Sequence, residues 1–144
     1  MRYPYQGQHY VDAALIICVD FRFHESCTKY VKEEMQLDFD LITMAGPQKN
    51  IAEDNALWRE VVKDIKKVCV ELHHIKKIVI FAHEDCGAYG GSNNFAGSEE
   101  EEQKYWEDLE TARQNLQRLF PELTIIIGYC KIVNDEYHFT VKMD

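Results

Sequence analysis

The sequence has few basic side chains for its length, and it has no long apolar stretch. Only 16 lysine and arginine residues stand against 25 aspartate and glutamate residues, so the formal net charge is -9. Nucleic-acid binding depends on clustered basic side chains that neutralise phosphates, and this sequence has no such cluster. The apolar run at 13–19 is far shorter than the roughly 20 residues that cross a bilayer. Residues 1–8 lack the apolar stretch of a signal peptide. We therefore expect a cytoplasmic protein that binds neither nucleic acid nor membrane.

A disulfide framework is also missing. The five cysteines are an odd number in irregular positions, which fits reduced thiols or metal ligands better than paired disulfides. Apolar residues make up 46% and charged residues 28% of the chain, as in a soluble globular protein. A chain of 144 residues can bury one core but is short for two. We expect a single domain over residues 1–144.

Short apolar runs alternate with amphipathic segments along the chain. The runs that predict strands lie at 13–19, 39–44, 78–82, 123–129 and 137–141. The segments that predict helices lie at 24–37, 54–74 and 98–120, and Ser98 with Glu101 has the pattern of a capping box. This alternation predicts an α/β fold. We expect a mostly parallel sheet in the order 2-1-3-4 plus an antiparallel edge strand, with helices on both faces, because right-handed crossovers place them there.

Three possible metal ligands follow the ends of two predicted strands. Cys18 ends the first strand, and His83 and Cys86 follow the third. Ligands of open α/β sheets bind at the carboxyl ends of the strands, near the point where the strand order reverses. Two sulfurs and one imidazole nitrogen suit Zn²⁺, which in catalytic sites keeps a fourth position for water. The sequence therefore predicts a zinc site formed by Cys18, His83 and Cys86.

Two short motifs resemble those of the β-class carbonic anhydrases. The segment Cys-Val-Asp-Phe-Arg at 18–22 is similar to the Cys-x-Asp-x-Arg motif of that family, and His-Glu-Asp-Cys-Gly at 83–87 is similar to its His-x-x-Cys-Gly motif. The resemblance extends through Ala-Gly at 45–46 and Gly-Tyr at 128–129, so it covers the chain from about residue 13 onward. It implies zinc-dependent, reversible hydration of carbon dioxide, a small-molecule substrate, to bicarbonate.

The resemblance also implies a role for each motif residue. Cys18, His83 and Cys86 would hold zinc, while Asp20 and Arg22 would form a dyad that orients zinc hydroxide as the nucleophile. The planar, permanently charged guanidinium of Arg22 is suited to clamp a carboxylate. A homodimer or a higher homo-oligomer is also expected from the resemblance.

The sequence departs from the family pattern at the residues expected to line the site. Phe21 stands where the family commonly has serine, and Thr-Met-Ala-Gly-Pro at 43–47 replaces a segment that often reads Arg-Asn-Ala-Gly-Asn. Two alternatives therefore stay open. The same site could act on another small electrophile, carbon disulfide or carbonyl sulfide, because Phe21 and Met44 are apolar. The protein could instead be a non-catalytic zinc scaffold whose site is closed by Asp20.

The other cysteines and the run of glutamates have simpler interpretations. Cys27, Cys69 and Cys130 are predicted to be core residues, because an unpaired cysteine packs as a small apolar side chain. The glutamates at 99–102 are predicted to form a solvated helix start, where the helix dipole favours acidic side chains.

Overall fold

Five strands form one sheet in the computed structural model of the chain, which describes residues 1–143. The strands are β1 (Ala13–Ile17), β2 (Phe39–Thr43), β3 (Lys77–His83), β4 (Thr124–Val133) and β5 (Glu136–Met143). Their order is β2-β1-β3-β4-β5, with every pair parallel except β4 and β5. The predicted α/β class, strand order and antiparallel edge strand are confirmed.

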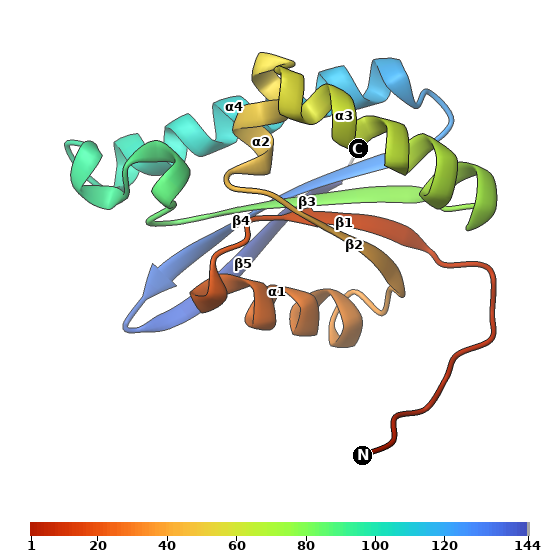
Figure 1. Cartoon of the computed structure of the whole chain (residues 1–144). Coiled ribbons are helices and arrows are strands. Elements are labelled where there is room, and N and C mark those ends of the chain that lie inside the picture. The colour runs from red at the N-terminus through yellow and green to blue at the C-terminus, as the bar shows by residue number, and fades with distance from the viewer. Residues whose placement is uncertain (144) are drawn as a thin grey trace.

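Helices cover both faces of the sheet (Figure 1). One face carries α1 (Phe21–Glu33), and the other carries α2 (Pro47–Glu53), α3 (Ala56–Asp64) and α4 (Ser98–Leu119). Two short 3₁₀ turns, η2 (Gly87–Tyr89) and η3 (Ser92–Asn94), follow β3. Among the helices of residues 1–143, none is long and apolar enough to cross a membrane.

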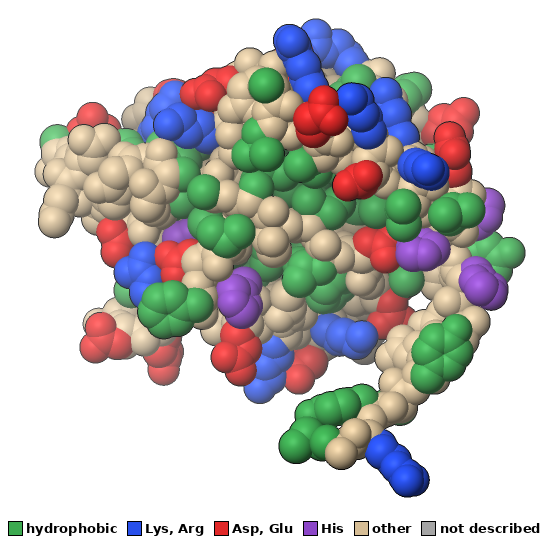
Figure 2. Space-filling model, viewed as in Figure 1, with side chains coloured by type: hydrophobic (Ala, Val, Ile, Leu, Met, Phe, Trp, Pro, Cys, Tyr) green, Lys and Arg blue, Asp and Glu red, His purple; other side chains and the backbone are tan. Residues whose placement is uncertain are grey.

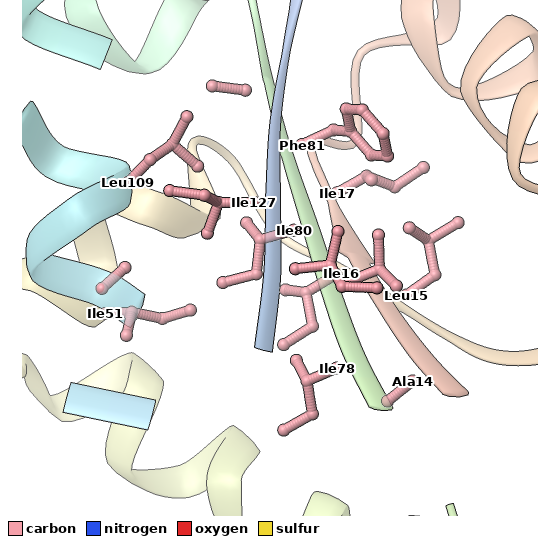
Figure 3. Packing of buried hydrophobic residues seen from close by; sticks show 14 of the residues in the cluster. Ala14, Leu15, Ile16, Ile17, Ile51, Ile78, Ile80, Phe81, Leu109 and Ile127 are labelled. Atoms are coloured by element: carbon pink, nitrogen blue, oxygen red, sulfur yellow. The ribbon is translucent and has the colours of Figure 1, made fainter. Parts of the chain in front are cut away.

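The central strands are buried on both faces, which explains their continuous apolar sequences. Every residue of β1 is fully buried, and so are the residues at 78–81 in β3. Figure 3 shows Leu15 and Ile16 of β1 near Ile80 of β3 in this core. Each fully buried Leu, Ile, Val or Phe side chain contributes about 1.5–3 kcal/mol. The two strands that end at the candidate site therefore belong to the buried centre of the sheet.

The predicted helix at 54–74 is only partly an α-helix. Asp54 adopts a left-handed conformation that ends α2, a helix that the periodicity did not predict. Asn55 then caps α3 by accepting a hydrogen bond from the backbone N–H of Trp58 at 3.1 Å. The chain continues beyond α3 as a π-helix, η1 (Ile65–Leu72).

The π-helix changes which side chains face the core. Ile65 and Cys69 are buried. Val68 and Leu72 follow Ile65 by three and seven residues, the spacing of one α-helical face, but they are 36% and 58% exposed. A π-helix closes its hydrogen bonds one residue further along than an α-helix. The 3.6-residue period therefore does not describe this segment.

The start of α4 also differs from the prediction. Gly97 occupies the N-cap position without a side-chain hydrogen bond, and Ser98 is already the first helical residue. The predicted capping box of Ser98 and Glu101 is therefore wrong. Glu101 instead turns its carboxylate into the protein, where only 1% of the residue is exposed.

The N-terminal segment at 1–11 lies outside the strands and helices and extends from the body (Figure 1). Its aromatic side chains Tyr3, Tyr5 and Tyr10 are exposed. The backbone N–H of Val11 donates to the carbonyl of His73 at 3.2 Å. On the face shown in Figure 2, acidic and basic side chains are interspersed over the body.

Candidate metal centre

Cys18, His83 and Cys86 meet at the carboxyl ends of β1 and β3. Their ligand atoms, two Sγ and a ring nitrogen, all lie within 4.8 Å of one another, and the three residues are buried. The two sulfurs are 3.9 Å apart. Because β1 and β3 are parallel neighbours, the two strands end side by side. The structure thus brings together the three residues that the sequence analysis expected to act as ligands.

His83 presents one ring nitrogen to this cluster. Its Nδ1 lies 2.9 Å from the carbonyl oxygen of Glu84, so Nδ1 carries the proton and donates to that carbonyl, leaving a lone pair on Nε2. Nε2 is buried and has no hydrogen-bond partner among the described residues. An unpartnered buried polar atom is costly. A metal ion bound to Nε2 would remove that cost, so the histidine fits a metal ligand.

The two thiols of the cluster differ in pKa. The hydrogen bond from the Cys86 thiol lowers the pKa of Cys18 well below its ordinary value. The same contact, together with burial, raises the pKa of Cys86. One sulfur is therefore already a thiolate near neutral pH, and thiolate is the form that binds metal. This donor set of two sulfurs and an imidazole fits zinc.

Asp20 and Arg22 form an ion pair beside the cluster. Arg22 Nη2 donates to Asp20 Oδ2 at 2.6 Å, and Nε lies 3.1 and 3.2 Å from the two carboxylate oxygens. Asp20 also caps α1 by accepting from the backbone N–H of Arg22 at 2.8 Å. This cap starts α1 three residues before the predicted boundary. The hydrogen bond from the Arg22 side chain lowers the pKa of Asp20, which stays ionised.

Asp20 is close to the ligand cluster without belonging to it. Its Oδ2 lies 4.0 Å from Nε2 of His83. Within residues 1–143, the group of ligand atoms near enough to share one ion comes from Cys18, His83 and Cys86. The geometry therefore places a clamped carboxylate beside the three possible ligands.

A buried glutamate ties α4 to the loop that carries Cys86. Glu101 Oε2 accepts hydrogen bonds from the backbone N–H of Asp85 and from the Tyr105 hydroxyl, each at 2.7 Å. The Tyr105 hydroxyl in turn accepts from the backbone N–H of Cys86 at 3.3 Å. The prediction of a solvated glutamate run is wrong for Glu101. The available signal was its spacing of four residues from Tyr105, which puts both on one helix face.

Gly46 allows the loop after β2 to pass close to the metal loop. Its φ is +54°, and a Cβ built there would lie 2.6 Å from the Cβ of Ala88 and 3.8 Å from Sγ of Cys86. A larger residue would therefore push against the turn that follows Cys86.

A cavity of about 620 Å³ opens over the cluster. It is lined by Cys18, Val19, Asp20, Phe21, Arg22, Ala45, Gly87 and Ala88. Phe21 stands on its rim with 80% of its surface exposed, whereas Met44 is buried and does not line the cavity. A second cavity of about 670 Å³ lies at α2 and α4 and is lined by none of the possible ligands. The polar side chains among the residues that line the cavity at the cluster are Asp20, Arg22 and the Cys18 thiol, and the others are apolar or glycine.

The sheet topology defines an α/β protein with the β-carbonic anhydrase fold. A β-carbonic anhydrase of Trichomonas vaginalis matches with a TM-score of 0.57 and 11% identity, over 100% of this chain and 90% of that one. A tetrameric β-carbonic anhydrase of Sordaria macrospora matches with a TM-score of 0.52 and 14% identity, over 94% and 84% of the two chains. At these identities the likeness concerns the fold.

The sequence comparisons give the family itself. A family model described as "Putative carbonic anhydrase" matches residues 9–142, and the chain belongs to this family. An uncharacterized protein of Rickettsia bellii is 28% identical over 131 residues, covering 85% of this chain and 80% of that protein. Another, from Rickettsia conorii, is 30% identical over 131 residues, covering 85% and 70%.

Proposed function

We propose that the protein catalyses the reversible hydration of carbon dioxide to bicarbonate, with a zinc ion held by Cys18, His83 and Cys86. One observation carries this proposal: a complete three-residue ligand set lies 4.0 Å from a carboxylate that an arginine clamps. Membership of the carbonic anhydrase family supports it. Bound zinc supplies a Lewis acid that lowers the pKa of water to about 7, which makes hydroxide available near neutral pH.

Asp20 orients the nucleophile in this proposal. As a carboxylate it only accepts hydrogen bonds, so it would accept a hydrogen bond from the attacking hydroxide and leave an oxygen lone pair directed at the carbon of carbon dioxide. That lone pair would form the new C–O bond while one C=O π pair moves to oxygen, which gives bicarbonate. The proton that water lost leaves to solvent.

Arg22 keeps Asp20 in its accepting state. The guanidinium stays charged at every physiological pH, and its bonds from Nε and Nη2 occupy both oxygens of Asp20. Each hydrogen bond favours the ionised carboxylate and opposes its rotation toward the cluster. The largely apolar lining of the cavity outside Cys18, Asp20 and Arg22 suits a weakly polar substrate.

The test is carbon dioxide hydration by the zinc-loaded protein, with zinc measured in every preparation. Asp20→Asn should abolish most of the turnover while zinc stays bound, because the amide offers one acceptor in place of two. Asp38→Asn is the matched control, since it removes a carboxylate from an exposed ion pair with Lys32 elsewhere. Absence of hydration at one zinc per chain would refute the proposal.

Closure of the site by Asp20 is a second candidate, favoured by the same 4.0 Å separation. A small rotation would make this carboxylate a fourth ligand, and the protein would then be a non-catalytic zinc scaffold. A structure of the zinc-loaded protein decides between the two, because the fourth ligand is water in one case and Asp20 in the other.

A different substrate is favoured by Phe21, whose apolar ring stands at the cavity rim. Carbon disulfide and carbonyl sulfide are linear like carbon dioxide but less polar at their ends. Parallel assays with the three substrates separate these activities. Turnover confined to carbon dioxide would rule this version out.

We also propose a homodimer or higher homo-oligomer. The Sordaria macrospora proteins are tetrameric, and Phe21 and Val19 are exposed apolar side chains beside the site of this chain. Sedimentation velocity at several concentrations tests the assembly, and a monomer throughout would contradict it.

A further inference from the structure

Arg22 is held by a second aspartate, which the proposed Asp20–Arg22 dyad does not include. Its Nη1 donates to Oδ2 of Asp85 at 3.0 Å, and its Nη2 donates to the backbone carbonyl of Asp85 at 3.0 Å. The adjacent edge of the guanidinium, through Nε and Nη2, holds Asp20. A planar group fixed along two edges keeps one orientation. Arg22 therefore bridges two carboxylates.

Asp85 is itself fixed by contacts that leave it turned toward Arg22. Its φ is +62°, a conformation that non-glycine residues keep only where the surroundings impose it. Its backbone N–H donates to Glu101 at 2.7 Å, and its Oδ1 accepts from the backbone N–H of Ser92 at 2.8 Å. Only Oδ2 and the carbonyl oxygen remain, and both accept from Arg22.

The position of Asp85 in the chain links the two halves of the site. It lies between His83 and Cys86 on the β3 side, whereas Arg22 and Asp20 follow β1. The ion pair between Arg22 and Asp85 thus crosses from the loop between His83 and Cys86 to the segment that carries the orienting carboxylate. Movement of that loop would be transmitted to Asp20 through the guanidinium.

We propose that Asp85 is a positioning residue that acts through Arg22 and keeps Asp20 beside the metal rather than on it. This inference rests on the proposed function. Without the Asp85 carboxylate, Arg22 would still face Asp20 but would lose its anchor at Nη1, so its bonds to Asp20 would open more often. Arg22 and Asp20 would then be free to rotate together. Because Asp20 Oδ2 lies only 4.0 Å from Nε2 of His83, a small rotation would bring this oxygen within reach of the metal position.

Asp85→Asn is the sharpest variant. An amide has one acceptor oxygen, which cannot serve both Ser92 and Arg22, and asparagine tolerates positive φ, so the loop conformation is kept. Asp54→Asn is the matched control. Asp54 also has positive φ, at 50°, and is also ion-paired to an arginine, Arg59, at 3.0 Å.

In the zinc-loaded protein, Asp85→Asn should lower kcat by about tenfold to a hundredfold, the range that a misplaced orienting group produces. KM and zinc content should stay unchanged in Asp85→Asn. The control Asp54→Asn should leave kcat, KM and zinc content unchanged. Zinc loss in proportion to the loss of activity would overturn the inference, because Asp85 would then support the ligands and not Arg22.

A second measurement does not depend on turnover. Hydrogen exchange of the Arg22 Nε–H, followed by ¹⁵N NMR on the zinc-loaded protein, should be several-fold faster in Asp85→Asn and unchanged in Asp54→Asn. Equal exchange in Asp85→Asn and the unsubstituted protein would overturn the inference. If the unsubstituted protein does not hydrate carbon dioxide, the proposed function fails, and this exchange measurement still decides whether Asp85 positions Arg22.

Discussion

Phe23 lies almost flat against the imidazole of His83, with ring centroids 4.6 Å apart and an interplanar angle of 21°. Phe23 belongs to α1 and His83 ends β3, so the contact joins the helix on one face to the candidate metal centre. The Phe23 ring also makes an edge contact with Tyr137 and stacks near Phe139. The stack fixes the plane of the imidazole and excludes water from one side of it.

Phe23→Leu should therefore weaken zinc binding as well as folding. Loss of a hydrogen-bonding partner that orients a ligating histidine typically costs about 10–100-fold in metal affinity, and we expect loss of the stacked ring to cost an amount at the lower end of this range. Competition with a chromophoric chelator measures the zinc affinity. Phe81→Leu is the control, because Phe81 is equally buried and packs on Tyr30 and Phe139. A similar affinity loss in both variants would contradict a specific role for the stack.

Removal of the Glu101 carboxylate should destabilise the fold. Glu101→Ala leaves the backbone N–H of Asp85 without its buried acceptor, which costs about 1–3 kcal/mol in the free energy of unfolding. Glu101→Gln should cost less, since both donors use the same oxygen, Oε2, and an amide oxygen can replace it. Urea unfolding measures both. The exposed Glu99, in the same first turn, provides the control Glu99→Ala. Equal losses at the two positions would refute a structural role for Glu101.

In the metal-free protein, Cys18 should be the most reactive cysteine. The hydrogen bond from Cys86 lowers its pKa, so its thiolate persists as the pH falls, whereas an ordinary thiol loses reactivity below a pKa of about 8.5. Burial raises the pKa of Cys69 to about 12 and also raises that of Cys27 and Cys130. Iodoacetamide labelling at pH 6 and 8, mapped by mass spectrometry, should modify Cys18 first at both values. A tenfold or greater loss of Cys18 labelling at pH 6 would contradict the lowered pKa.

The charge of Asp20 should contribute stability that disappears in acid. Arg22 lowers the pKa of this carboxyl in the folded state, so the contribution is complete above the unfolded pKa, about 3.9, and is lost as the pH falls through the folded value. Asp20→Asn keeps a side-chain oxygen for the α1 cap but removes the charge. Metal-free Asp20→Asn should therefore melt below the unsubstituted protein at pH 7, and the difference should shrink below pH 4. A difference in melting temperature that is constant with pH would contradict the ion pair's contribution.

The sheet and the ligand set were predictable because they depend on short-range pattern. Buried parallel strands have continuous apolar sequences, as at 13–17 and 78–81, and the carboxyl ends of such neighbours meet at one edge. That rule brings Cys18, His83 and Cys86 to one edge as possible ligands, and the resemblance of the two motifs to the family supports the choice of these three residues. The carbonic anhydrase family that the motifs resembled is the family to which the chain belongs.

The parts that escaped prediction depend on contacts between distant segments. Asp85 reaches an arginine 63 positions away, and Glu101 reaches a backbone group 16 positions away. Asp85 differs neither by type nor by spacing from a solvated acid, and the one signal at Glu101 was its spacing of four residues from Tyr105. The π-helix at 65–72 was not predicted for a related reason. Tertiary packing, and not the 3.6-residue period, decides which of its side chains are buried.

The separation of the two cysteines along the chain has a topological consequence. Cys18 and Cys86 are 68 positions apart, and β2, α2, α3 and η1 all lie between them. An ion bound to both sulfurs would act as a removable cross-link that closes a loop of the chain between Cys18 and Cys86. Such a link restricts the unfolded chain as a covalent bridge does. If the backbone were cut once between Cys18 and Cys86, the bound ion would still hold the two fragments together. A chelator would then release them.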